Sequence, residues 1–153
     1  MKVIADCAGT KGMLSGQVVD VQSEGKKIDE ETLLYIHHNK TAAMIAAALK
    51  AGAILAGNQE AAEQFFTAGD HIGLAFQIQD DILDVVGSAK ELGKPVHSDE
   101  KNEKNTYVSM YGLEKSHEMV EQFSSQAVEI FRTYQDKGQF LIRLTEYLIQ
   151  RKN

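Results

Sequence analysis

Apolar side chains recur every three or four residues along most of the chain, which is the spacing of one buried face of an α-helix. The spacing is clearest in four segments, residues 30–53, 60–86, 120–134 and 140–148. Strict alternation of apolar and polar residues, the mark of a half-buried strand, is not convincing anywhere. The pattern therefore predicts about five helices and no strand.

Polar residues and glycines indicate where these helices begin and end. The stretch Asp29–Thr32 supplies an N-cap and an acidic first turn. Gly57-Asn58 ends the first segment, and Gly87-Ser88 is expected to end the second. The stretch before Asp29 is too short to classify by its pattern. If it is helical, Gln17 and Asp20 share a face, where they either line a cavity or belong to the surface.

The composition favours a helical fold. The 153 residues include one proline, Pro95, whereas all-β domains need frequent turns rich in glycine and proline. Long helices avoid proline because it breaks the backbone hydrogen-bond ladder. We therefore predict an all-α fold, and the length is that of a single domain spanning residues 1–153.

Charge and cysteine content exclude several function classes. Sixteen Lys and Arg stand against 22 Asp and Glu, a net charge of −6, so nucleic-acid binding through a basic surface is not expected. The single Cys7 excludes a disulfide framework and a multi-cysteine zinc site. No apolar run approaches the roughly 18 residues of a membrane span, and the first residues lack the apolar core of a signal peptide. We expect a cytoplasmic protein with no membrane span.

The segment 72–86 carries the strongest candidate chemistry. The side chains of Gln77, Asp80, Asp81 and Asp84 fall within an arc of about 100° on a helical wheel, and apolar residues fill the rest of the circumference. A surface helix shows the opposite proportion. We therefore expect this helix to be buried on most sides, with its carboxylates facing an enclosed space.

Carboxylates this close together repel one another and need a cation in a dry site. Asp80 and Asp84 lie four residues apart, so one divalent ion can touch both. Mg²⁺ suits the arrangement because it takes one or two protein carboxylates and completes its shell with water and phosphates. The alternative is a solvated acidic helix end, but the apolar residues on both sides favour the metal.

Candidate cations for a phosphate lie in two places. Lys40-Thr41 interrupts an alanine-rich apolar helix, where a lysine either faces a cavity or an anion, or extends to the surface. Lys94 and Lys104 lie in the polar stretch 88–105, which is long enough to be a lid over a diphosphate. Ordinary surface charge is the alternative for both lysines.

Together these motifs resemble those of the trans-isoprenyl diphosphate synthases, and most closely the bacterial farnesyl diphosphate synthases, or geranyltranstransferases. The matching motifs are Gly16-Gln17-X-X-Asp20, Lys40-Thr41, Gly73-Leu-Ala-Phe-Gln-Ile-Gln-Asp-Asp-Ile-Leu-Asp84 and Gly93-Lys94. The third resembles the family's second aspartate-rich motif, and the resemblance extends over essentially the whole chain.

The resemblance implies a fold and a reaction. The fold is a helical bundle of the isoprenoid synthase type around a deep cavity. The reaction condenses isopentenyl diphosphate with an allylic diphosphate such as geranyl diphosphate, after magnesium-assisted loss of diphosphate gives an allylic carbocation. The two diphosphates are thus the expected substrates, and Mg²⁺ is the expected cofactor.

The resemblance also gives each candidate residue a role. Asp80 and Asp84 would hold the magnesium ion, with Asp81 supporting them. Lys40 and Lys94 would contact the allylic diphosphate. The other predicted site residues are Thr41 and Gln77 beside the carbocation, Gln17 and Asp20 further along the pocket, and Lys104 in the loop.

Part of the family pattern is missing. The family has a first aspartate-rich motif, neighbouring arginines and an N-terminal isopentenyl diphosphate site, and no counterpart precedes Asp80. We therefore expect the C-terminal half of a short-chain prenyltransferase, weakly active or inactive alone. Its exposed apolar faces should associate with a second copy or with a missing N-terminal half. The alternative is a non-catalytic helical subunit, or a truncated fragment, that binds a partner chain.

Overall fold

The computed structural model describes residues 2–92 and 105–151, with the backbone alone for 88–92. Within these ranges every regular element is helical, so the predicted all-α fold is confirmed. The elements are α1 (Lys2–Ala8), α2 (Met13–Gln22), α3 (Glu30–His37), the π-helical turn η1 (His38–Ala42), α4 (Ala43–Leu55), α5 (Gln59–Leu92), α6 (Tyr107–Tyr111), α7 (Leu113–Arg132), the 3₁₀ turn η2 (Gln135–Gly138) and α8 (Gln139–Gln150).

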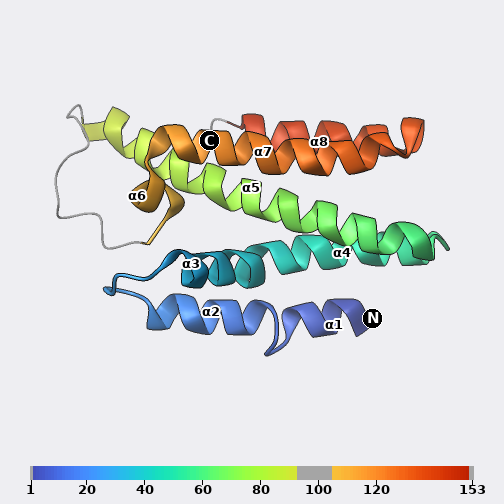
Figure 1. The fold of residues 1–153 in the computed structure, drawn as a ribbon, viewed down its shortest axis with the longest axis horizontal. Coiled ribbons are helices and arrows are strands. Elements are labelled where there is room, and N and C mark those ends of the chain that lie inside the picture. Colours follow the sequence, from blue (N-terminus) through green and yellow to red (C-terminus); the bar gives the residue numbers. More distant parts are fainter. Residues whose placement is uncertain (1, 93–104, 152–153) are drawn as a thin grey trace.

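Figure 1 shows how the helices are layered. α1 and α2 lie end to end beside a rod formed by α3, η1 and α4. The 34-residue α5 lies between this rod and the neighbouring helices α7 and α8, and α6 packs on α5 and α7. α5 is therefore the element against which most of the others pack.

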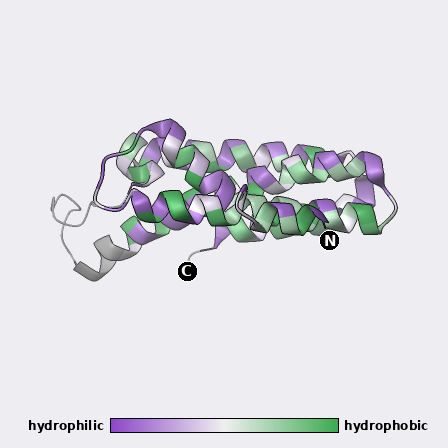
Figure 2. Cartoon of the chain, turned by 90° about the horizontal axis from the view of Figure 1, so that it is seen from below, coloured by the Kyte–Doolittle hydropathy of each residue, from purple (hydrophilic) through white to green (hydrophobic). Residues whose placement is uncertain are grey.

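Among the described residues the core consists of three clusters, and α5 contributes to each of them. The first contains Ile78 and Tyr107, the second Ile72 and Phe131, and the third Ala62. Hydrophobic and hydrophilic residues alternate in short bands along the helices (Figure 2), as amphipathic helices require. Burying a large apolar side chain stabilises the fold by about 1.5–3 kcal/mol, so these clusters hold the layers together.

The helix ends agree with the sequence pattern in two places and differ in one. The Asp29 side chain accepts a hydrogen bond from the Thr32 N–H at 2.9 Å, which confirms the predicted N-cap. Gly57 has a φ of 74° and follows the end of α4. The predicted helix end at Gly87 is wrong, because α5 continues to Leu92. Glycine weakens a helix by about 1 kcal/mol, but it ends one readily only where it takes a positive φ, as at Gly57.

The stretch before Asp29 that the pattern left unclassified is helical, and it forms α1 and α2. The apolar side chains of Leu14, Val18 and Val21 are 50%, 53% and 56% exposed on α2. We call these three residues the α2 stripe. Across the ranges that the structure describes, no helix is both long enough and apolar enough to cross a membrane.

Candidate active site

Lys40 and Thr41 lie in η1, the π-helical turn between α3 and α4. Single π turns inside α-helices are rare and often occur at functional sites. The extra residue of such a turn changes the directions in which neighbouring side chains point. Here Lys40 faces α2 and Thr41 faces α5, since their hydrogen-bond partners lie on those two helices.

Two glycines let α2 and α5 approach η1 closely from its two sides. A Cβ atom at Gly16 would lie 2.4 Å from the Lys40 backbone nitrogen, and one at Gly73 would lie 2.3 Å from the Ala42 Cα atom. Neither separation is possible for real atoms, so these positions require glycine. The close approach fixes the backbone that carries Lys40 relative to both helices.

The Lys40 ammonium pairs with a carboxylate on α2. Its Nζ atom lies 2.6 Å from Asp20 Oδ2, and each side chain is 36% exposed. This pair explains how a lysine is accommodated in an apolar helix, because the ammonium faces an anion at the edge of the core. Gln17 lies one turn before Asp20 and is exposed.

A hydrogen-bonded series links η1, α5 and α6. The Thr41 hydroxyl donates to Gln77 Oε1 at 2.9 Å, and the Gln77 side chain also hydrogen-bonds to Asp81. Because the Gln77 oxygen already accepts from Thr41, its amide N–H₂ group is the donor to Asp81. The Asp81 carboxylate also accepts from the Tyr107 N–H at 3.3 Å. The orientation of Gln77 is therefore fixed from both sides.

The three aspartates of α5 lie in different environments. Asp81 is buried, and burial raises the pKa of its carboxyl group to about 7. Asp84 is exposed, and the Asp80 side chain is 45% exposed. The expected enclosed space is therefore wrong for Asp80 and Asp84, which lie on an open face of the chain. The wheel groups them with Asp81, but only Asp81 is covered by α6.

Arg151, which the sequence analysis missed, is the partner of Asp80. Its Nη2 atom donates to Asp80 Oδ1, and its guanidinium carbon lies 3.8 Å from the ring centroid of Phe76. Phe76 lies one turn before Asp80, so both contacts come from the same face of α5. The residues are about half the chain apart in sequence, and no local pattern connects them.

The structure allows a test of whether the aspartates suit the expected Mg²⁺. In the described part of the chain, no group of three or more His, Cys, Asp or Glu side chains could hold a metal. Asp80 and Asp84 offer two accessible carboxylates one turn apart, and Asp80 already accepts a cationic guanidinium. The residues therefore fit an ion that takes one or two carboxylates and completes its shell with water and phosphate.

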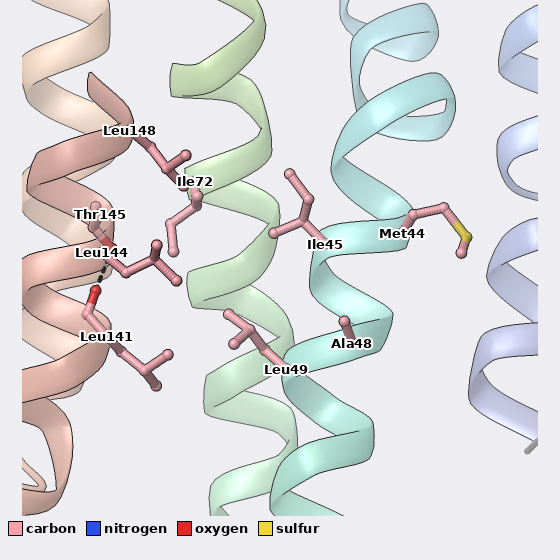
Figure 3. A pocket seen from close by; sticks show the side chains of 9 residues that line it. All are labelled: Met44, Ile45, Ala48, Leu49, Ile72, Leu141, Leu144, Thr145 and Leu148. Carbon is pink, nitrogen blue, oxygen red and sulfur yellow. Dashed lines mark hydrogen bonds between the residues drawn. The ribbon is translucent and has the colours of Figure 1, made fainter. Parts of the chain in front are cut away.

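An apolar pocket of about 350 Å³ lies between α4, α5 and α8 (Figure 3). Ile72 of this pocket lies one turn before Phe76 on α5, and Leu148 lies three residues before Arg151 in the sequence. The lining residues are Met44, Ile45, Ala48, Leu49, Ile72, Leu141, Leu144, Thr145 and Leu148. The predicted lysines Lys94 and Lys104 lie outside the described residues.

Comparison with known families identifies the group to which these motifs belong. The family model described as "Polyprenyl synthetase" matches residues 1–141. The chain belongs to the polyprenyl synthetase family. Its motifs on α2, η1 and α5 thus lie within the matched region.

Two relatives of this polyprenyl synthetase chain match it over nearly its full length. A geranylgeranyl diphosphate synthase of Cyanophora paradoxa is 39% identical over 158 residues, which cover 100% of this chain and 53% of that protein. A farnesyl diphosphate synthase of Micrococcus luteus is 38% identical over 152 residues, which cover 99% of this chain and 52% of that protein. The chain spans about half the length of the relatives it matches.

Solved structures give the same result for the fold. A geranyltransferase of Legionella pneumophila matches with a TM-score of 0.77 and 29% identity, over 99% of this chain and 49% of that one. A geranyltransferase of Helicobacter pylori, complexed with magnesium and isoprenyl diphosphate, matches with a TM-score of 0.76 and 29% identity, over 97% and 49%. The polyprenyl synthetase chain therefore has the helical fold of these transferases.

Proposed function

We propose that the chain forms one wall of a prenyl-transfer site in which isopentenyl diphosphate condenses with an allylic diphosphate. The hydrogen bond between Thr41 and Gln77 carries the proposal, because it joins two separate family motifs across η1 and α5. Lys40 and Asp80 lie next to them on the same two elements. The relatives named farnesyl and geranylgeranyl diphosphate synthases support the same reaction.

Side chains of this chain can contact both the phosphate end and the allylic carbon of an allylic diphosphate. Lys40 can exchange its partner Asp20 for a phosphate oxygen, since both side chains are partly exposed. The Thr41 hydroxyl donates to Gln77, so its oxygen keeps lone pairs that can face positive charge as it develops on the allylic carbon. Gln17 and Asp20 remain proposed contacts further along the pocket.

Asp80 and Asp84 would hold Mg²⁺ in this proposal, as the complex of the Helicobacter pylori geranyltransferase with magnesium and isoprenyl diphosphate supports. The bound ion would neutralise the diphosphate and so assist its departure. Asp81 would support the site indirectly, because it orients Gln77 and holds α6 through the Tyr107 N–H. Lys94 and Lys104 stay proposed diphosphate contacts.

Calorimetric titration with inorganic diphosphate in the presence of Mg²⁺ tests the assignment. Charge-assisted hydrogen bonds contribute about 1.5–3 kcal/mol each, so we expect Asp80→Asn and Lys40→Gln to weaken binding by roughly ten- to a hundredfold. Asp136→Asn is the matched control, because Asp136 is exposed on η2. Equal affinities for all three variants would refute the assignment.

We also propose that the chain works in association with a second copy or with the half of a polyprenyl synthetase that it does not match. Two apolar surfaces support this. One is the α2 stripe, and the other is the pocket in Figure 3 together with Phe140 and Tyr147 of α8, which are 72% and 73% exposed. A covering chain would remove both surfaces from water.

A further inference from the structure

We propose that Arg151 occupies the metal-facing carboxylate of Asp80 when no metal is bound, and that a divalent cation must displace it. The inference rests on the proposed function, which makes Asp80 a metal ligand. Arg151 would compete with the metal for the Asp80 carboxylate and so lower the affinity of the site for the metal.

Two contacts from one face of α5 hold the guanidinium in place. Arg151 Nη2 donates to Asp80 Oδ1, and the planar group lies over the Phe76 ring, 3.8 Å from its centroid to the guanidinium carbon. Arginine suits both contacts because its guanidinium is planar, permanently charged and able to stack on an aromatic ring. The pair thus places a positive charge where the metal would neutralise Asp80.

The same pair is poorly suited to be a permanent structural bridge. Arg151 Nε is buried and has no hydrogen-bond partner in the described residues, so the guanidinium is only partly satisfied. The Asp80 side chain is 45% exposed, and ion pairs that are open to solvent contribute little. A doubly charged ion with oxygen ligands therefore has an energetic advantage over Arg151 at this carboxylate.

The backbone at Arg151 allows the exchange without loss of helix. α8 ends at Gln150, and Arg151 has an extended backbone with φ −59° and ψ 143°. Moving the guanidinium away from Asp80 therefore breaks no α-helical hydrogen bond of Arg151 itself. Metal binding on α5 would thereby be coupled to Arg151, the residue that follows α8.

Binding of Mn²⁺ alone, followed by the electron paramagnetic resonance signal of the free ion, tests the competition. Diphosphate is left out, so that Arg151 cannot act on a phosphate. We expect Arg151→Gln to bind Mn²⁺ about two- to fivefold more tightly, which corresponds to the modest strength of an exposed pair. Arg143→Gln removes the same charge from an exposed position on α8 and should leave the affinity unchanged.

Nuclear magnetic resonance gives a second measurement that does not depend on a variant. The chain has three arginines, Arg132, Arg143 and Arg151, so their Nε–Hε signals can be separated. Saturating Mg²⁺ should shift the Arg151 signal and leave the Arg143 signal in place. The Arg151 shift should disappear in the Asp80→Asn variant.

The outcomes separate this inference from the proposed function. If Asp80→Asn weakens Mn²⁺ binding but Arg151→Gln leaves it equal or weaker, the competition is refuted and the metal assignment stands. An Arg151 signal that saturating Mg²⁺ does not move has the same meaning. If Asp80→Asn leaves Mn²⁺ binding unchanged, the metal assignment itself is overturned.

Discussion

Asp81 is the residue of the candidate site whose charge depends most on its surroundings. Its carboxyl group is buried beneath α6, and desolvation raises its pKa from 3.8 to about 7. In the folded chain it is therefore protonated at pH values where the unfolded chain is ionised. Such a group stabilises the fold fully below the unfolded pKa, and this contribution is lost as pH rises toward the folded pKa.

We expect the metal-free Asp81→Asn variant to show a weaker pH dependence of stability. Asparagine cannot ionise, so the variant lacks the stability that Asp81 loses as pH rises. The difference in free energy of unfolding between the variant and the original chain should therefore shift by about 2 kcal/mol in favour of the variant from pH 5 to pH 8. Urea unfolding followed by circular dichroism at both pH values measures the difference. An Asp136→Asn control should show no such gain. A pH-independent difference between Asp81→Asn and the original chain would contradict the raised pKa.

At the scale of single residues, the sequence predicts the candidate site in part. The spacing of Asp80 and Asp84 is enough to place them one turn apart on a helix, because helical periodicity is local. The separate environment of Asp81 depends on Tyr107, which is 26 residues further along the chain. The partner of Asp80 is Arg151, 71 residues away. Contacts at these separations follow from the packing of helices and leave no local pattern.

The elements around η1 depend on close backbone approach. We expect Gly73→Ala to destabilise the chain by about 1–3 kcal/mol, because its Cβ atom would overlap the Ala42 backbone and force α5 away from η1. Gly52→Ala is the matched control, since a Cβ atom there meets nothing within 4 Å inside α4. The free energy of unfolding of that variant should be about 0.5–1 kcal/mol higher than that of the original chain.

Thermal unfolding followed by circular dichroism measures both glycine variants. Equal destabilisation by Gly73→Ala and Gly52→Ala would mean that close approach to η1 is not what requires glycine at residue 73. A lower stability of Gly73→Ala together with a higher stability of Gly52→Ala would support the close packing of α5 on η1.

At the scale of elements, apolar periodicity is sufficient for the main helices but not for their details. The Asp29 cap is predicted because its residue types act within a single turn. The continuation of α5 through Gly87 is not predicted, since a glycine pattern cannot distinguish a helical φ from a positive one. The apolar pattern does not predict the π turn at His38–Ala42 either, and α2 and α5 approach this turn closely.

For the molecule as a whole, we expect the purified chain to condense geranyl and isopentenyl diphosphates at least about a hundredfold more slowly than the full Micrococcus luteus relative. The chain spans about half of that protein, and the candidate metal site on α5 has two accessible aspartates, Asp80 and Asp84. Incorporation of radiolabelled isopentenyl diphosphate measures the rate. A rate close to that of the relative would contradict the expectation.

Association is the second expectation at this scale. We expect the chain to sediment with a weight-average mass that rises with concentration, because the α2 stripe exposes three apolar side chains in a row. Val18→Glu should reduce this rise, whereas Gln122→Glu, at an exposed position on α7, should not. A mass that stays monomeric at all concentrations, or equal effects of both variants, would argue against self-association through α2.

The fold class and family are predictable at this scale because they depend on features spread over the whole chain. The scarcity of proline, the helical periodicity and the quoted motifs all agree. Which apolar residues stay exposed to solvent cannot be predicted from the hydrophobic pattern alone. Leu14 and Val18 have the same apolar character as buried residues such as Leu33, and only the packing of α2 distinguishes them.

The position of α5 has a consequence for how the chain loses its structure. α5 supplies residues to the three core clusters, including Ala62, Ile72 and Ile78, so opening it between Ala61 and Ile82 exposes core residues. We therefore expect its central amide protons to exchange with solvent through unfolding of the whole chain. α1 has no buried residue and can fray without disturbing a core cluster. Stability thus decreases outward from α5 toward α1.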